Sequence, residues 1–275
     1  MDSSVPRVPL ADGHSIDVIG YGVYKVPPED TEELCTTALD AGYRLLDTAA
    51  LYGNEAGVGA AARAYAGGRG DLFITSKVWN DDHGYDATLR AFDAGLERLG
   101  LEYLDLYLIH WPCPSRDLYV ESWRALERLR ADGRVRSIGV SNFQQDHLER
   151  LIAETGVVPV LNQVELHPYL QQHALRAFHD QHGIATQAWS PLGRGNVLTD
   201  PVIARIAAEL GRTPAQVILR WHLQHGILTI PKASSRERIA SNLDIFGFRL
   251  DDGQLDALDA LERDQRFGSH PDKVG

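Results

Sequence analysis

Four residues of different chemistry follow or end short apolar runs in the first half of the chain: Asp47, Tyr52, Lys77 and His110. A phenol has an ordinary pKa of about 10, and a neighbouring ammonium lowers that pKa because it stabilises the phenolate. If Asp47 holds Lys77 beside Tyr52, the phenol becomes a better proton donor to an alkoxide forming from a carbonyl. His110 can hydrogen-bond the same oxygen and orient it. The set therefore predicts carbonyl reduction.

Further polar or aromatic residues stand at the ends of the later apolar runs. They are Ser141, Asn142, Gln163, Trp189, Ser190 and Lys232. Barrel enzymes place their chemistry at the carboxyl ends of parallel strands. Burying a charge is costly unless it is paired, and a carboxylate, an ammonium and an imidazole at one mouth can pair with each other. This arrangement predicts an active site.

Eight short β-rich runs must position these residues, and helical patterns follow most of them. We expect strands over residues 18–22, 44–48, 72–78, 104–110, 135–141, 160–165, 185–190 and 228–232. We expect helices over 31–41, 55–65, 87–99, 120–131, 145–154, 172–181, 202–210, 214–224 and 237–244. Apolar strands that alternate with helices form parallel sheets, and eight such units predict a (β/α)8 TIM barrel. The alternative is an open doubly wound sheet.

Residues 8–16 precede the first unit and read as a β-hairpin that turns at Asp12-Gly13. We expect this hairpin to plug the bottom of the barrel. A short C-terminal tail of about 14 residues follows Leu261. Because no linker or change of composition divides the chain, we expect residues 1–275 to form a single barrel domain.

Composition narrows the classes of partner and of location. The chain has 275 residues and a net charge of −11, which disfavours binding to nucleic acid. No segment is apolar enough to cross a membrane, and the polar start Met1-Asp2-Ser3-Ser4 does not resemble a secretion signal. Cys35 and Cys113 are too few for a disulfide framework or a four-cysteine zinc site. We expect a cytoplasmic protein, a monomer, with no bound metal.

Several segments together resemble the aldo-keto reductase family. They are LDTAALYGNE at 46–55, KVW at 77–79, LYLIHWP at 106–112, IGVSNF at 138–143 and IPK at 230–232. The segments GVYKVPP at 22–28 and SHPDKV at 269–274 are most similar to the bacterial 2,5-diketo-D-gluconic acid reductase branch. The resemblance covers almost the whole chain in family order. It implies a (β/α)8 barrel, NADPH as cofactor, and a catalytic tetrad at Asp47, Tyr52, Lys77 and His110.

The same resemblance assigns the cofactor site. It implies that the nicotinamide end is bound by Ser141, Asn142, Gln163 and Trp189, the pyrophosphate by Ser190, Pro191, Leu192 and Gly193, and the adenosine 2′-phosphate end by Lys232, Ser234, Arg238 and Asn242. A lysine and a guanidinium there favour NADPH over NADH. Many members have Ser at the position of Ala233 and Glu at that of Ser241. These departures predict somewhat weaker dinucleotide binding.

Aromatic residues just past the strand ends predict the substrate pocket, with Tyr24, Trp79 and Trp111 as its walls. We expect reduction of small aldehydes, dicarbonyls or keto sugars, with Tyr52 as general acid. Two alternatives stay open. One is a non-catalytic redox sensor that binds NADPH on the same fold, and the other is a lyase that forms a Schiff base at Lys77.

Overall fold

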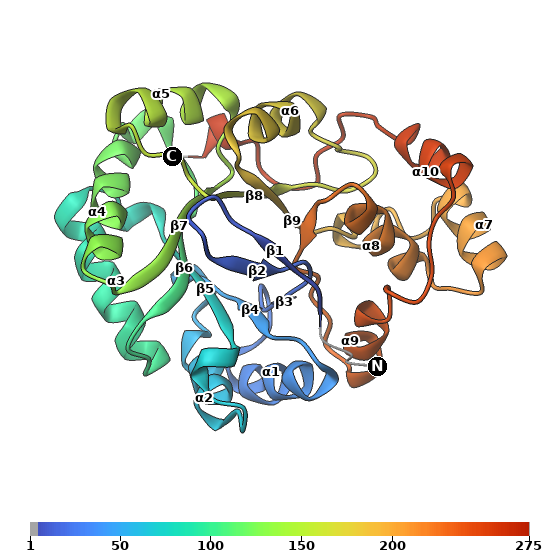
Figure 1. Cartoon of the computed structure of the whole chain (residues 1–275), viewed down its shortest axis with the longest axis horizontal. Helices are drawn as coiled ribbons and strands as arrows, with labels where there is room; N and C mark the ends of the chain where they lie inside the picture. Colours follow the sequence, from blue (N-terminus) through green and yellow to red (C-terminus); the bar gives the residue numbers. More distant parts are fainter. Residues whose placement is uncertain (1–4, 275) are drawn as a thin grey trace.

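Eight parallel strands form the centre of the protein in the computed structural model, which describes residues 5–274 (Figure 1). Strands that follow one another in the chain are neighbours in the sheet. The strands are β3 (Tyr21–Gly22), β4 (Leu45–Asp47), β5 (Phe73–Val78), β6 (Leu104–Ile109), β7 (Val135–Ser141), β8 (Leu161–Glu165), β9 (Ala185–Trp189) and β10 (Leu228–Thr229). The polar start Met1 to Ser4 lies outside the described residues, as does Gly275.

Hydrogen bonds between the first and last strands close the sheet into a barrel. The N–H of Gly20 donates to the carbonyl of Thr229 at 2.8 Å, and the N–H of Thr229 donates to the carbonyl of Val18 at 3.1 Å. Gly22 is needed at this seam because a Cβ there would lie 2.8 Å from the carbonyl oxygen of Ile230. The closure confirms the predicted (β/α)8 barrel and excludes an open sheet.

Helices surround the strands in Figure 1. They are α1 (Pro28–Ala41), α2 (Glu55–Ala64), α3 (Tyr85–Leu99), α4 (Tyr119–Ala131), α5 (Gln145–Thr155), α6 (His173–His182), α7 (Pro201–Leu210), α8 (Pro214–Gln224), α9 (Arg236–Leu243) and α10 (Asp252–Asp259). The sequence analysis predicted all but α10. Asp251 caps α10 by accepting the N–H of Gln254, so a capping box marks a start that the analysis missed.

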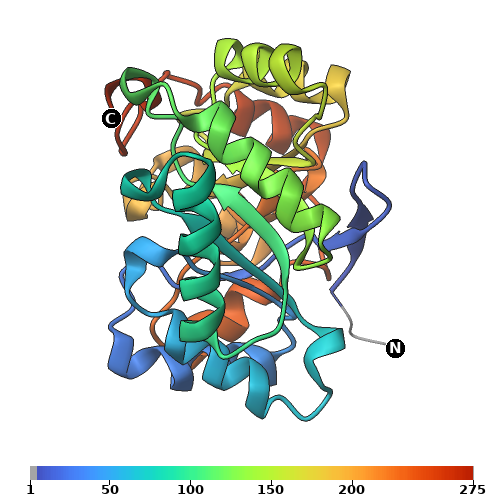
Figure 2. The ribbon, with the colours of Figure 1, turned by 90° about the vertical axis from the view of Figure 1, so that its left-hand side faces the viewer.

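The predicted hairpin closes one end of the barrel. Strands β1 (Arg7–Pro9) and β2 (Ser15–Asp17) pair antiparallel, and Ile16 is fully buried. Asp17 faces Arg44 and Asp105, which lie at the amino ends of β4 and β6. Figure 1 shows the hairpin across the ring of strands, and Figure 2 places it opposite the end that holds the C-terminus. The expected plug at the bottom of the barrel is confirmed.

Candidate active site

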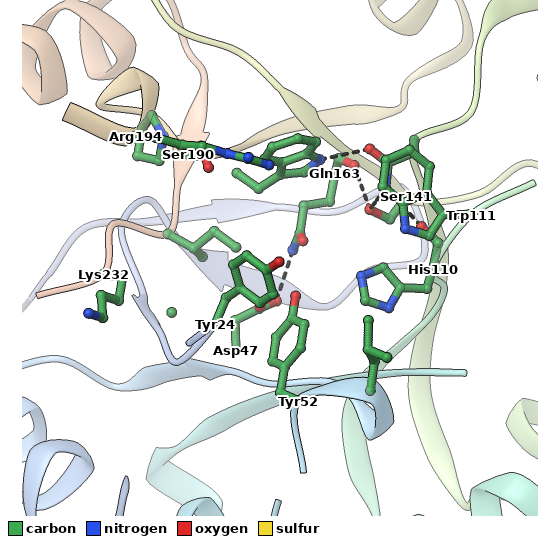
Figure 3. Close-up of a pocket in the computed structure, with 16 residues that line it drawn as sticks. Tyr24, Asp47, Tyr52, His110, Trp111, Ser141, Gln163, Ser190, Arg194 and Lys232 are labelled. Carbon is green, nitrogen blue, oxygen red and sulfur yellow. Dashed lines mark hydrogen bonds between the residues drawn. The ribbon is translucent and has the colours of Figure 1, made fainter. Parts of the chain in front are cut away.

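The four residues predicted to act together do converge at the carboxyl end of the barrel. Asp47 ends β4, Lys77 lies in β5, and His110 directly follows β6. Tyr52 ends a 3₁₀ turn, Ala50–Tyr52, in the loop after β4. Figure 3 shows the phenol of Tyr52 and the imidazole of His110 pointing into one pocket, with Asp47 beside Tyr52. The arrangement brings a hydroxyl and an imidazole to the same small space.

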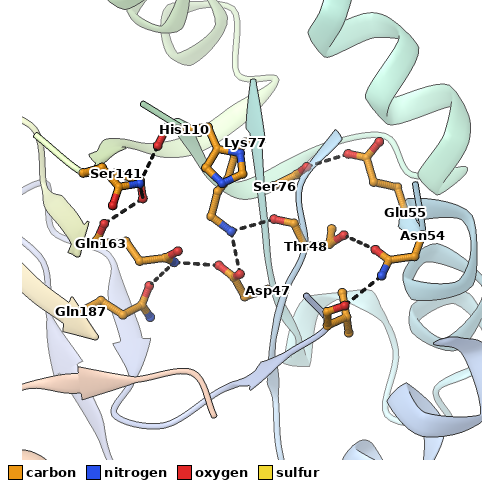
Figure 4. Close-up of polar contacts among 12 residues, drawn as sticks. Asp47, Thr48, Asn54, Glu55, Ser76, Lys77, His110, Ser141, Gln163 and Gln187 are labelled. Carbon is orange, nitrogen blue, oxygen red and sulfur yellow. Dashed lines mark hydrogen bonds and ion pairs between the residues drawn. The ribbon is translucent and has the colours of Figure 1, made fainter. Parts of the chain in front are cut away.

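A buried ion pair lies behind this pocket (Figure 4). The Nζ of Lys77 donates to Asp47 Oδ1 at 2.6 Å and to the carbonyl of Thr48 at 2.9 Å, and Lys77 is fully buried. Asp47 Oδ2 accepts the amide of Gln163 at 2.8 Å. Burial lowers the pKa of Lys77, although the carboxylate of Asp47 opposes that shift. Removal of either Asp47 or Lys77 would leave the other charge buried without its partner.

The phenol of Tyr52 differs from the expectation in one respect. The ammonium of Lys77 lies 5.2 Å from the centre of its ring and donates its hydrogen bonds elsewhere. Burial raises the pKa of Tyr52 well above its usual value, and the charges of Asp47 and Tyr24 raise it further. The predicted lowering of this pKa by Lys77 is therefore not found, because burial and the charges of Asp47 and Tyr24 all raise it. Tyr52 keeps its proton at neutral pH.

His110 is held among aromatic rings. Trp79 packs edge-on against it with ring centres 5.2 Å apart, and Tyr52 does so at 5.7 Å. Trp111 stacks on it at 6.4 Å. Burial lowers the pKa of His110 well below its usual value, and the charge of Lys77 adds to this effect. At neutral pH the imidazole is therefore uncharged and can donate one N–H to an oxygen.

Two of the three predicted substrate walls line the pocket. Tyr24 and Trp111 face the cavity, while Trp79 contacts it through His110. The ring of Tyr24 also lies 5.0 Å from that of Tyr52. Leu51 was not predicted as a wall, but its side chain lines the same cavity and is half exposed. An apolar residue next to Tyr52 in a loop was the signal that could have found it.

The residues assigned to the nicotinamide end line the same pocket and bond to one another. The indole Nε1 of Trp189 donates to Asn142 Oδ1 at 2.8 Å, and Asn142 Nδ2 donates to the carbonyl of His110 at 2.8 Å. The hydroxyl of Ser141 donates to the carbonyl of Gln163 at 2.7 Å. These bonds fix an aromatic face and several amide groups beside Tyr52 and His110.

A groove continues from this pocket along the loops after β9 and β10. It is lined by Ser190, Pro191, Leu192, Lys232, Arg238 and Asn242, together with Ala233 and Ser241. Gly193 is buried and does not line the groove, and Ser234 accepts a hydrogen bond from the Arg238 guanidinium at 3.4 Å. Ser190 has a φ of 47°, in the left-handed region, so the chain turns sharply where β9 ends. Within residues 5–274, Lys232 and Arg238 form no ion pair with a carboxylate.

Three buried polar residues support the site but were not singled out from sequence. Asn54 accepts from Thr48 at 2.8 Å and donates to the carbonyl of Val23 at 2.9 Å, joining the two loops that carry Tyr52 and Tyr24. Gln187 accepts from the amide that bonds Asp47. Glu165 ends β8 and is fully buried. Their positions inside a strand or directly before a helix could have identified them from the sequence, because polar residues buried there need hydrogen-bond partners.

Residues 5–274 contain neither a helix that could span a membrane nor a cluster of metal ligands. Over residues 5–274, no helix is long and apolar enough to cross a bilayer. In the same part of the chain, no three His, Cys, Asp or Glu side chains gather as metal ligands. The monomeric state and the lack of nucleic-acid binding stay predictions.

Comparison with known proteins identifies the family. The model of the aldo/keto reductase family matches residues 18–263. The chain is 49% identical to a glyoxal reductase of Bacillus subtilis (strain 168), over 97% of this chain and 96% of that protein. It is 46% identical to the methylglyoxal reductase DkgA of Escherichia coli (strain K12), over 98% of each.

A solved structure of a mutant of Gox0644 in complex with NADPH superimposes with a TM-score of 0.95 at 49% identity, covering 99% of each chain. The similarity extends over the strands, the loops at their carboxyl ends and the C-terminal residues, because so little of either chain is left unmatched. The resemblance inferred from the sequence motifs is thus confirmed at the level of the family, and the assignment to the diketogluconate branch is compatible with it. This chain belongs to the aldo/keto reductase family.

Proposed function

We propose that the protein reduces the carbonyl group of small aldehydes, dicarbonyls or keto sugars to an alcohol, with NADPH as cofactor. One observation carries this proposal. A neutral phenol, Tyr52, and a neutral imidazole, His110, face one pocket in front of the buried Lys77–Asp47 pair. A carbonyl oxygen that gains negative charge needs a proton donor and a second hydrogen-bond donor, and these two groups supply both.

The residues present fit NADPH. The indole of Trp189 offers a flat face whose orientation is fixed by Asn142, and amides of Asn142 and Gln163 lie beside it. The groove ends at two cations, Lys232 and Arg238, which suit the charge of a phosphate monoester. When bound, NADPH supplies a hydride. The preference over NADH is part of the proposal, and Ala233 and Ser241 in the groove are expected to weaken binding of either dinucleotide.

Each of the four polar residues has a separate role in the proposed reaction. Tyr52 donates the proton to the substrate oxygen, and the raised pKa of its phenol ensures that the proton is present. His110 donates a hydrogen bond to the same oxygen and orients the carbonyl. Lys77 lies close enough to the ring of Tyr52 to stabilise the phenolate that remains, and Asp47 keeps Lys77 charged.

A small, polar substrate fits the pocket. Tyr24, Trp111 and Leu51 line the pocket together with polar groups such as Tyr52 and His110. Relatives named glyoxal reductase and methylglyoxal reductase support a small dicarbonyl as the substrate class. The Schiff-base alternative is less favoured, because Lys77 is fully buried and its ammonium is already bonded to Asp47 and Thr48.

The test is loss of NADPH absorbance with methylglyoxal, an aromatic aldehyde and a 2,5-diketo sugar acid, with NADH measured in parallel. We expect clear turnover with NADPH, and loss of turnover in Tyr52→Phe without loss of NADPH binding. Tyr43→Phe is the control, since Tyr43 is also buried but bonds the carbonyl of Ile239 away from the pocket. Tight NADPH binding without turnover would favour the sensor, and borohydride trapping of substrate on Lys77 would favour the lyase.

A further inference from the structure

We infer that Glu165 is a positioning residue, which fixes the C-terminal segment (residues 262–274) behind Trp189 and so holds the nicotinamide end of the cofactor site. The inference rests on the proposed use of NADPH. It concerns a buried carboxylate that none of the steps above employs. Glu165 stands at the end of β8 and is the register partner of Trp189 at the end of β9. The two side chains therefore start from neighbouring points of the barrel rim.

The carboxylate of Glu165 binds backbone of the C-terminal segment. Its Oε1 accepts the N–H of Phe267 at 2.6 Å, and its Oε2 accepts the N–H of Gly268 at 2.9 Å. Arg266 lies 3.9 Å from Oε2, and the imidazole of His167 lies 3.2 Å from Oε1. Two successive N–H groups on one carboxylate hold this part of the chain in one place, because both bonds must be satisfied together.

The held backbone lies directly against the indole. A Cβ added to Gly268 would stand 2.4 Å from Trp189 Cη2, so only a glycine allows this approach. The ring of Phe267 lies against Gly193 in the next loop, at 3.1 Å from where a Cβ would stand, and it also packs on His167. Trp189 is therefore held from two sides, by Asn142 at its Nε1 and by Gly268 at its six-membered ring.

The charge of Glu165 suits this role. Burial raises the pKa of the carboxyl, but the bonds from His167, Phe267 and Gly268 outweigh burial and lower the pKa below its usual value. Glu165 is consequently ionised at neutral pH and acts only as an acceptor. The N–H of Gly268 also lies 3.1 Å from Oε1, so an amide oxygen there could still accept from both Phe267 and Gly268. The amide would nevertheless remove the charge and turn an N–H₂ group toward the N–H of Gly268 in place of Oε2, so the segment would be held less firmly.

A carboxylate that only stabilises the fold could make the same bonds to the C-terminal segment. The test must therefore separate an effect on stability from an effect on cofactor binding. We compare Glu165→Gln with Asp105→Asn. Asp105 is equally buried, accepts the N–H of Ile74 at 2.9 Å and pairs with two arginines, but it lies at the hairpin end of the barrel. Both changes remove a charge that holds backbone, and both are expected to lower the melting temperature.

Calorimetry then measures two ligands, NADPH and adenosine 2′,5′-bisphosphate, which lacks the nicotinamide. A stacked aromatic ring contributes a modest part of the affinity, so we expect Glu165→Gln to weaken NADPH binding by about fivefold while bisphosphate binding changes by less than about twofold. Asp105→Asn should leave both affinities unchanged. Equal losses for both ligands in Glu165→Gln, or no loss for either, would overturn the inference.

Gly268→Ala provides a second test of the inference if Glu165→Gln does not fold. Its added methyl group would stand 2.4 Å from Trp189 Cη2 and 2.7 Å from Glu165 Oε2, so it disturbs the same contact, and we expect the same selective loss of NADPH affinity. Gly70→Ala is its control, because a Cβ there meets nothing within 4 Å. Unchanged NADPH affinity in Gly268→Ala would contradict the inference. If the unaltered protein does not bind NADPH at all, the proposed cofactor is wrong; if it binds and the variants match it, only the role of Glu165 is wrong.

Discussion

Replacing Asp47 by asparagine tests the central pair of the site. Lys77 is fully buried and its ammonium lies 2.6 Å from Asp47 Oδ1. Breaking one side of a buried pair typically costs about 3–5 kcal/mol of folding free energy, against a total stability of about 5–15 kcal/mol. Burial already lowers the pKa of Lys77, and Asp47 is the main group that opposes this shift. In Asp47→Asn, the pKa of Lys77 therefore falls further, and the charged form of Lys77 is disfavoured.

The loss of that charge sets the expected change in rate. With an effective dielectric constant of about 20, charges separated by the 5.2 Å between Lys77 Nζ and the Tyr52 ring centre attract by about 3 kcal/mol. This attraction stabilises the phenolate formed as Tyr52 gives up its proton. Its removal should slow the chemical step on the order of 10²-fold. Single-turnover oxidation of NADPH by methylglyoxal measures this step.

Two comparisons make the reasoning refutable. Lys77→Met removes the same charge but leaves the carboxylate of Asp47, which also raises the pKa of Tyr52. It should therefore slow the step by at least the same factor, and the double variant should be no slower than Lys77→Met. A double variant that loses the product of the two factors, or an Asp47→Asn rate within about threefold of the unaltered enzyme, would refute the account. Stability supplies a pH test: the folded pKa of Lys77 lies below its unfolded value, so the deficit of Asp47→Asn should shrink as pH rises toward 10.

Three further outcomes follow from single groups. Arg238→Gln should weaken NADPH by about tenfold or more in calorimetry and leave NADH unchanged, because only NADPH carries the 2′-phosphate. Tyr24→Ala should raise KM for methylglyoxal more than it lowers kcat, since Tyr24 lines the pocket without being placed to transfer a proton. Burial raises the pKa of Asp17 to about 6, so the native state binds a proton that the unfolded chain has released, and stability falls as pH rises from 4 to 6. Asp17→Asn should therefore increase the free energy of unfolding at pH 8 by up to about 3 kcal/mol, which thermal melting would detect as a higher melting temperature. The increase should be much smaller at pH 4.

The architecture was largely predictable because its signals are local. Each buried parallel strand reads as an apolar run, and polar residues mark the ends at the barrel mouth. The ends of the strands at the seam were less predictable: the strand expected over 228–232 stops at Thr229, since Pro231 has no N–H to donate. Helix α10 was missed because its capping box starts a short helix beyond the eighth unit.

The site was predictable in its members and less so in its electrostatics. The structure brings Asp47, Tyr52, Lys77 and His110 together as expected. The direction of the shift in the pKa of Tyr52 differs from the expectation, because spacing along the chain does not show how deeply the phenol is buried. Glu165 was overlooked, since its partners lie on a distant segment that carries no pattern of its own.

The seam that closes the barrel has a consequence for how the protein is made. Val18 and Gly20 form hydrogen bonds with Thr229. These bonds near the start of the chain cannot form until the ribosome has added Thr229, late in synthesis. Until then β3 is an open edge whose N–H and C=O groups have no partner on that side. Contacts of such large sequence separation slow folding. We expect the nascent protein to depend on chaperones until β10 emerges, and to become protease-resistant only at that point of translation.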